Sequence, residues 1–108
     1  MAPKEYKRRV ALFLSWAEDA SWTEGIDPMG VQREMWDLGC VLTNRYGFGI
    51  LTHAIELYKP LAAVREQVRD FIDGYSDPDT LLLLYYGGHG SYTVEDGLLW
   101  SASGFVIL

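Results

Sequence analysis

The chain has 108 residues, of which 49% are hydrophobic, and its formal net charge is −6. This length predicts one domain or part of one, and the hydrophobic share is enough for a packed core, which argues against disorder. The acidic balance argues against a broad phosphate-binding surface, and therefore against a nucleic acid as partner.

Cysteine content and hydropathy indicate which disulfides, metal sites and membrane segments the chain can have. The single cysteine, Cys40, excludes an internal disulfide framework and any metal site built from several cysteines. No apolar run approaches the roughly 20 residues that span a bilayer, and the polar N-terminus lacks a signal-peptide pattern. We therefore expect a soluble, cytoplasmic protein with no membrane partner, and we predict neither a metal nor another cofactor.

The first predicted strand is the apolar run at residues 10–14, which follows a charged segment. A helix is predicted after it, with Asp27 as N-cap and Pro28 at its first helical position. Apolar residues recur at helical spacing through about Arg45, and residues 46–49 then break the helix.

The second predicted strand covers residues 50–56, and its mixed polar and apolar character favours a place near the edge of a sheet. Pro60 opens a second predicted helix, and Gly74 ends it. A third strand is predicted at residues 80–86, where continuous large apolar residues are typical of a strand buried on both faces.

This alternation predicts an α/β three-layer sandwich, with a parallel core sheet in the order second, first, third strand and helices on both faces. The topological switch point then falls between the first and third strands, and ligands of such sheets bind outside the carboxyl ends of the strands. The third strand has an unpaired outer edge in this arrangement, which invites pairing with another chain. Apolar residues at 98–100 and 105–108 predict a small hairpin, and the last segment either covers that edge or joins two chains.

The motif Gly87-Gly88-His89-Gly90 follows the third predicted strand directly. Glycines let the backbone turn sharply and leave N–H groups free to face a substrate. His89 is therefore a candidate general base, since the unperturbed pKa of histidine, about 6.5, lies near working pH. A phosphate loop is the other use of such glycines, but neither a following helix nor a Lys or Arg is present to support it.

Three segments share the order and spacing of one known family. They are Tyr46-Gly47-Phe48-Gly49-Ile50, the Leu-rich strand that leads into Tyr85-Tyr86-Gly87-Gly88-His89-Gly90, and Leu99-Trp100-Ser101-Ala102. Through these segments the chain resembles the caspase-like cysteine peptidases, and most closely their fungal caspase-domain and metacaspase-like branch. The resemblance covers residues 6 to 103, nearly the whole chain.

The resemblance implies a cysteine-type endopeptidase, a hydrolase, built on a caspase-hemoglobinase fold. His89 would correspond to the catalytic histidine, and the backbone N–H of Gly90 to one donor of the oxyanion hole. The family's nucleophilic cysteine lies about 50 residues beyond the histidine, whereas the sequence ends at Leu108. Residues 1–108 are therefore interpreted as an incomplete, truncated p20-type domain that is inactive alone, a pseudoenzyme that cleaves a peptide or protein only if completed.

Two function classes stay open at this point. The first is a caspase-like endopeptidase fragment that carries the histidine, and the second is a non-catalytic interaction module that pairs through its open sheet edge with itself or with a related full-length chain. Cys40 is expected to be a buried structural cysteine of the first helix rather than a substitute nucleophile. His53, in a half-buried strand, is expected to be a surface or hydrogen-bonded histidine rather than a second catalytic residue.

The segment after the first strand holds carboxylates and two tryptophans. Its acidic side chains could bind calcium through oxygen ligands, but a solvated acidic loop with one N-cap is the simpler interpretation. Trp16 and Trp22 flank this segment and either line an aromatic substrate pocket or pack within the loop. The four carboxylates are Glu18, Asp19, Glu24 and Asp27.

Overall fold

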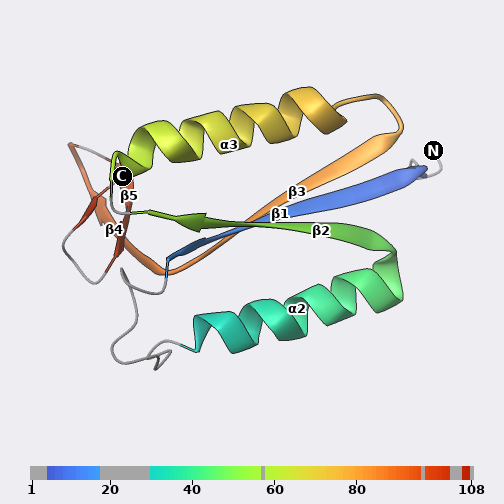
Figure 1. Cartoon of the computed structure of the whole chain (residues 1–108), viewed down its shortest axis with the longest axis horizontal. Helices are drawn as coiled ribbons and strands as arrows, with labels where there is room; N and C mark the ends of the chain where they lie inside the picture. Colours follow the sequence, from blue (N-terminus) through green and yellow to red (C-terminus); the bar gives the residue numbers. More distant parts are fainter. Residues whose placement is uncertain (1–4, 18–29, 57, 96, 103–105, 108) are drawn as a thin grey trace.

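The computed structural model describes residues 5–17, 30–56, 58–95, 97–102 and 106–107 of the chain. Within these residues, three parallel strands form one sheet, three antiparallel strands form another, and two helices run beside the parallel sheet (Figure 1). The fold is therefore mixed α/β, as predicted. In chain order the elements are β1 (Arg8–Trp16), α2 (Val31–Tyr46), β2 (Phe48–Ile55), α3 (Pro60–Tyr75), β3 (Thr80–Gly87), β4 (His89–Thr93), β5 (Gly97–Ala102) and β6 (Val106–Ile107).

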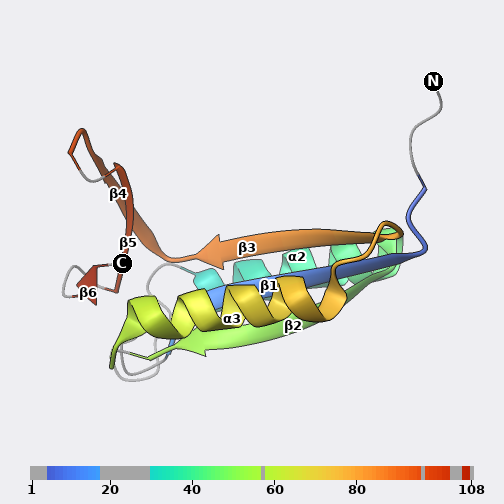
Figure 2. The same ribbon diagram turned by 90° about the horizontal axis from the view of Figure 1, so that it is seen from above.

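The parallel sheet has the strand order β2-β1-β3, which confirms the predicted order. The central strand, β1, is buried from Val10 to Trp16 because a strand lies on each side of it and a helix covers each face. Alternate residues of a strand point to opposite faces. The even-numbered residues from Val10 to Trp16 pack with α3, whereas Ala11 and Phe13 pack with α2. The two helices consequently cover opposite faces of the sheet (Figures 1 and 2).

Helix α2 begins later than the sequence predicts. Its N-cap is Gly30, whose left-handed backbone (φ 65°) is accessible to glycine at little cost, so the prediction of Asp27 as N-cap is wrong. Asp27 and Pro28 themselves lie outside the described residues. The helix ends at Tyr46 with Gly47 in the same left-handed conformation (φ 70°). β2 follows at once, two residues earlier than predicted.

Helix α3 begins at Pro60, as predicted, because proline suits the first helical turn, where an N–H has no helical partner. Gly74 does not end this helix, which corrects the sequence prediction. The helix continues to Tyr75, whose ring lies 5.8 Å from that of Phe71 and under the guanidinium of Arg8. These contacts stabilise the additional residue. Neither helix of the described chain has the length and apolar character needed to cross a membrane.

The antiparallel sheet has the order β4-β5-β6 and begins at His89. The hairpin predicted near the end of the chain corresponds to β5 and β6, in which Ala102 pairs with Val106. β4 extends it by a third strand that the sequence did not predict. Figure 2 shows β4 and β5 beyond the carboxyl ends of the parallel strands, so the second sheet adjoins the predicted site.

Candidate functional site at the carboxyl ends of β1 and β3

The candidate site lies where β1 and β3 end side by side. In their parallel register Ser15 pairs with Gly87, the last residue of β3. The chain leaves β1 toward β2 on one side and later returns to β3 on the other, so the switch point falls between these two strands. This position is the one at which open α/β sheets bind their ligands.

Three aromatic side chains from three strands meet at this end of the sheet. The indole Nε1–H of Trp16 donates a hydrogen bond to the hydroxyl of Tyr86 at 2.9 Å. The ring of Tyr86 stacks on that of Trp100, with 4.1 Å between centroids and 3° between planes. β5 is thereby joined to both β1 and β3. We refer to Trp16, Tyr86 and Trp100 as the aromatic cluster.

Trp16 packs in the core of the sheet, where neither interpretation from the sequence had placed it. Its side chain is only 2% exposed, so it offers almost no surface to a ligand. Trp22, the second tryptophan of that prediction, and the acidic residues from Glu18 to Asp27 lie outside the described residues.

The two glycines before His89 are required by close packing. A Cβ on Gly87 would lie 2.7 Å from Cγ1 of Val31, at the start of α2. A Cβ on Gly88 would lie 2.5 Å from the Tyr86 hydroxyl and 3.2 Å from the Trp16 ring. Neither position accepts a side chain without movement of its neighbours. Glycine also lets the backbone turn sharply here, as expected from the sequence, and close packing is a second reason for its presence.

His89 and Gly90 are the first two residues of β4, not members of an irregular loop. Their ladder partners in β5 are Ser101 and Trp100, respectively. The catalytic role predicted for His89 depends on its side chain, whose placement lies outside the part of the chain that the structure describes. Among the described atoms, a Cβ on Gly90 would meet the Leu99 carbonyl oxygen at 3.6 Å, an ordinary contact, so this packing does not demand glycine there. Its proposed oxyanion contact stays a prediction.

The structure does not bring Cys40 to this site. Cys40 lies in the middle of α2 and lines a groove against β2, whereas His89 follows β3, at the opposite edge of the sheet. Its side chain is half-buried rather than fully buried. This position gives no support to a nucleophilic role beside His89.

His53 differs from its prediction. It occupies the α3 side of β2, together with Leu51 and Ile55, and its Nε2 atom is buried without a hydrogen-bond partner among the described residues. His53 is therefore half-buried, and its Nε2 atom has no hydrogen-bond partner within the described part of the chain. The alternation of polar and apolar residues along β2 placed His53 on this face but could not show whether a partner was present.

One electrostatic feature near the end of β3 was not predicted. The phenol of Tyr85 donates a hydrogen bond to the carboxylate of Glu34 on α2. Partial burial, aided by this carboxylate, raises the pKa of Tyr85 to about 12. The phenol of Tyr85 is therefore protonated at neutral pH and donates its hydrogen bond to Glu34. The two residues are 51 positions apart, so no local sequence signal joins them.

In comparisons with known proteins, no family model, curated protein or solved structure matches the chain. The features of the chain that bear on function are the motif, its place at the switch point and the aromatic cluster beside it.

Proposed function

We propose that this chain carries the histidine part of a caspase-like cysteine endopeptidase with the three-layer caspase-hemoglobinase architecture, and that the nucleophilic cysteine comes from a segment outside these residues. One observation supports the proposal most strongly. The Gly-Gly-His-Gly motif begins at the carboxyl end of β3, beside the central strand and at the switch point of a β2-β1-β3 sheet. The substrate class is a peptide or protein, and no nucleic acid takes part.

The chemistry assigns roles to two residues of the motif, His89 and Gly90. The imidazole of His89 takes the thiol proton, and the resulting thiolate attacks the carbonyl carbon of the scissile peptide bond. The C–N bond then breaks, the imidazolium gives its proton to the leaving amine, and water later hydrolyses the thioester. The N–H of Gly90 stabilises the oxyanion, which is worth about 3 kcal/mol for one such donor. These steps suit the cytoplasm, where thiols stay reduced.

The open outer edge of β3 can pair with a further strand that carries the cysteine. Within the described residues no strand pairs with the outer side of β3, and the strand contains neither a charged residue nor a proline. A parallel strand added there ends beside the motif, because the carboxyl ends of parallel strands meet at one edge. A cysteine just beyond such a strand comes close to His89.

A synthetic peptide tests this arrangement. The peptide is an apolar strand that ends in Asp-Ala-Cys, and the readout is the rate at which iodoacetamide alkylates its cysteine near pH 6. A nearby imidazolium lowers the pKa of a thiol and raises its thiolate fraction. We expect the chain to accelerate alkylation about tenfold, which corresponds to a thiol pKa lowered by roughly one unit.

The chain offers a matched control because it has two histidines. His89→Ala should abolish the acceleration, whereas His53→Ala should retain it, since His53 lies under α3 on the edge strand β2. Equal acceleration by both variants, or none by the unaltered chain, contradicts the proposal. Peptide hydrolysis that disappears in Cys40→Ala would show that the nucleophile lies within the chain.

A second candidate function is a non-catalytic interaction module that pairs through the same edge. The exposure of Leu84, 46% in the middle of β3, favours it, because natural edge strands are commonly protected by charge or proline. The partner is then a second copy or a related full-length chain. Light scattering over a range of concentrations tests pairing with a second copy, since a monomer throughout contradicts self-pairing.

A further inference from the structure

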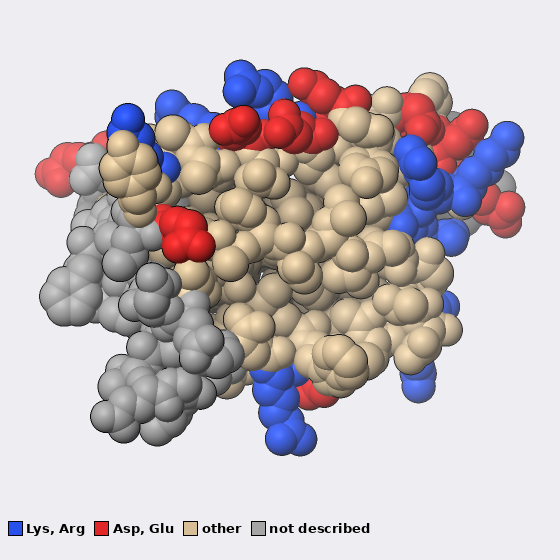
Figure 3. Space-filling view, in the orientation of Figure 1, with Lys and Arg blue, Asp and Glu red and all other residues tan. Residues whose placement is uncertain are grey.

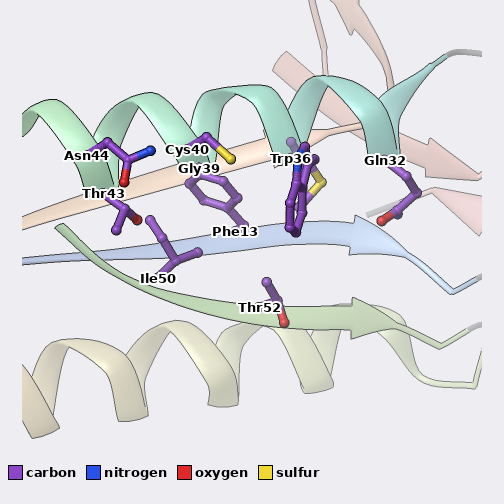
Figure 4. Close-up of a pocket in the computed structure, with 10 residues that line it drawn as sticks. Phe13, Gln32, Trp36, Gly39, Cys40, Thr43, Asn44, Ile50 and Thr52 are labelled. Atoms are coloured by element: carbon purple, nitrogen blue, oxygen red, sulfur yellow. The ribbon is translucent and has the colours of Figure 1, made fainter.

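A groove of about 400 Å³ lies between α2 and the edge strand β2, away from the histidine motif. Figure 4 shows its construction: the Phe13 ring lies beneath Gly39 and Cys40, while Ile50 and Thr52 project from β2 on the other side. This volume falls within the roughly 300–1,000 Å³ that is typical of small-molecule pockets.

Among the described residues, the lining of the groove is uncharged, although α2 is a charged helix. None of the ten described residues that line the groove is Asp, Glu, Lys or Arg. The charged residues Arg33, Glu34 and Asp37 line a separate groove on the other side of α2, beside Tyr85. On the face that Figure 3 shows, uncharged side chains cover the centre and charged side chains lie around the periphery. A charged ligand would lose its hydration without gaining a counter-charge, so the groove favours a neutral one.

Two aromatic rings bound the groove. Phe13 is 1% exposed and forms part of the floor, whereas Trp36 is 73% exposed and stands at the wall. An exposed tryptophan beside a concave surface offers a large flat contact area, and aromatic rings prefer to stack or to meet edge to face. Met35 adds a polarisable sulfur to the lining.

Gly39 keeps the floor of the groove open. Glycine within a helix is unfavourable relative to alanine, yet here it lies directly above the core ring of Phe13. A Cβ added at Gly39 would lie 3.7 Å from Cε2 of Phe13, an ordinary contact distance. Packing of the protein therefore tolerates alanine at this position, and the missing methyl group enlarges the groove.

A few polar groups accompany these apolar walls. The lining includes the amide of Asn44 and the hydroxyls of Thr43 and Thr52. Uncharged groups of this kind orient a ligand by hydrogen bonds to a hydroxyl, amide or carbonyl.

We propose that this groove binds a neutral, planar aromatic small molecule, with its ring system against Trp36 and Phe13 and one polar substituent toward the threonines or Asn44. The inference is independent of the proposed peptidase function, because the groove borders β2 and the histidine motif follows β3.

2-Naphthol tests the proposal as a neutral bicyclic probe, and 2-naphthalenesulfonate is its anionic counterpart. We expect 2-naphthol to shift backbone amide NMR signals of α2 and β2, and the sulfonate to bind at least about tenfold more weakly. Saturating 2-naphthol should also slow alkylation of Cys40, which lines the groove and is the only cysteine of the chain.

Two pairs of variants separate binding from folding. Gly39→Ala should raise the melting temperature by about 4 °C and still weaken 2-naphthol binding by at least about fivefold, because the methyl group occupies the groove. Gly74→Ala, in α3 with open space around the position, should leave the affinity unchanged. Trp36→Ala should abolish binding, whereas Tyr92→Ala, at the same 73% exposure in β4, should not.

Several results would overturn the inference. One is that 2-naphthol does not bind, and another is that the sulfonate binds as tightly as 2-naphthol. The remaining two are that Gly39→Ala and Gly74→Ala bind 2-naphthol with equal affinity, and that Trp36→Ala still binds it. A dimer that buries Trp36 would overturn it as well, because the groove would then belong to a second copy of the chain.

Discussion

At the scale of single residues, the glycines before His89 show how packing determines a motif. Gly88 is confined by the hydroxyl of Tyr86 and the ring of Trp16, which are themselves joined by a hydrogen bond. Among the described atoms, the nearest to a Cβ on Gly90 is the Leu99 carbonyl oxygen at 3.6 Å. The two glycines that flank His89 therefore differ in their tolerance of a side chain.

We accordingly expect Gly88→Ala to destabilise the protein by about 1–3 kcal/mol, the usual cost of forcing an extra methyl group into a packed region. Tyr86 must move to accommodate it, and the bond from Trp16 is then lost. Gly90→Ala should cost much less. Urea unfolding measures both, and equal midpoints for the two variants would contradict the packing argument.

At the scale of elements, the hydrophobic pattern of the sequence predicts the order of the parallel strands and their two helices, because neighbouring residues determine each of these patterns. The same pattern did not predict β4. Helix ends are less predictable. Gly30, not Asp27, caps α2, and α3 continues through Gly74 because Tyr75 packs on Phe71. The position of His89 after β3 was predicted, but its inclusion in a strand depends on pairing with β5, which no local pattern shows.

The turn that leads into β3 makes a pH-dependent contribution to the free energy of unfolding through Asp77. The Thr80 hydroxyl and the Asp79 N–H each donate a hydrogen bond of 2.8 Å to Asp77, and Arg8 lies 3.6 Å away. These groups, with Thr80 foremost, hold the pKa of Asp77 below its ordinary value of 3.8. The folded state thus binds this proton less tightly than the unfolded state. The stabilisation is complete above the ordinary pKa and is lost as the pH falls through the folded one.

Removal of the Thr80 hydroxyl should reduce the pH-dependent stabilisation that the folded state gains from Asp77. Thr80→Val deletes the hydroxyl but keeps the shape of the buried side chain, so the pKa of Asp77 should return toward its ordinary value. We expect the free energy of unfolding of the variant to fall less steeply than that of the unaltered chain below pH 3.8. Thermal unfolding at a series of acidic pH values measures the difference. Parallel profiles for the two proteins would contradict the assignment.

At the scale of the whole molecule, the two sheets meet at the aromatic cluster. Tyr86 belongs to the parallel sheet and Trp100 to the antiparallel one, and their stacked rings lie beside the motif that both sheets share. Neither the Trp16–Tyr86 hydrogen bond nor the Tyr86–Trp100 stack could be predicted from the sequence. Trp16 and Tyr86 are 70 residues apart, and the position of Trp100 depends on the path of the chain after Gly88. We infer that this stack holds the β4–β5 hairpin, and with it the backbone of His89, against the end of the parallel sheet.

The variant Trp100→Leu tests this coupling. It keeps an apolar side chain but removes the stack, which is worth about 0.5–1.5 kcal/mol beyond area burial. Amide hydrogen exchange should accelerate in β4 and β5, because local opening of the hairpin no longer has to separate the rings, while the amides of β1 keep their protection. Trp36→Leu provides the control, since its indole is 73% exposed on α2. If exchange in β4 and β5 is the same in both variants and in the unaltered chain, the hairpin is held by other contacts, and the position of the His89 backbone does not depend on the aromatic cluster.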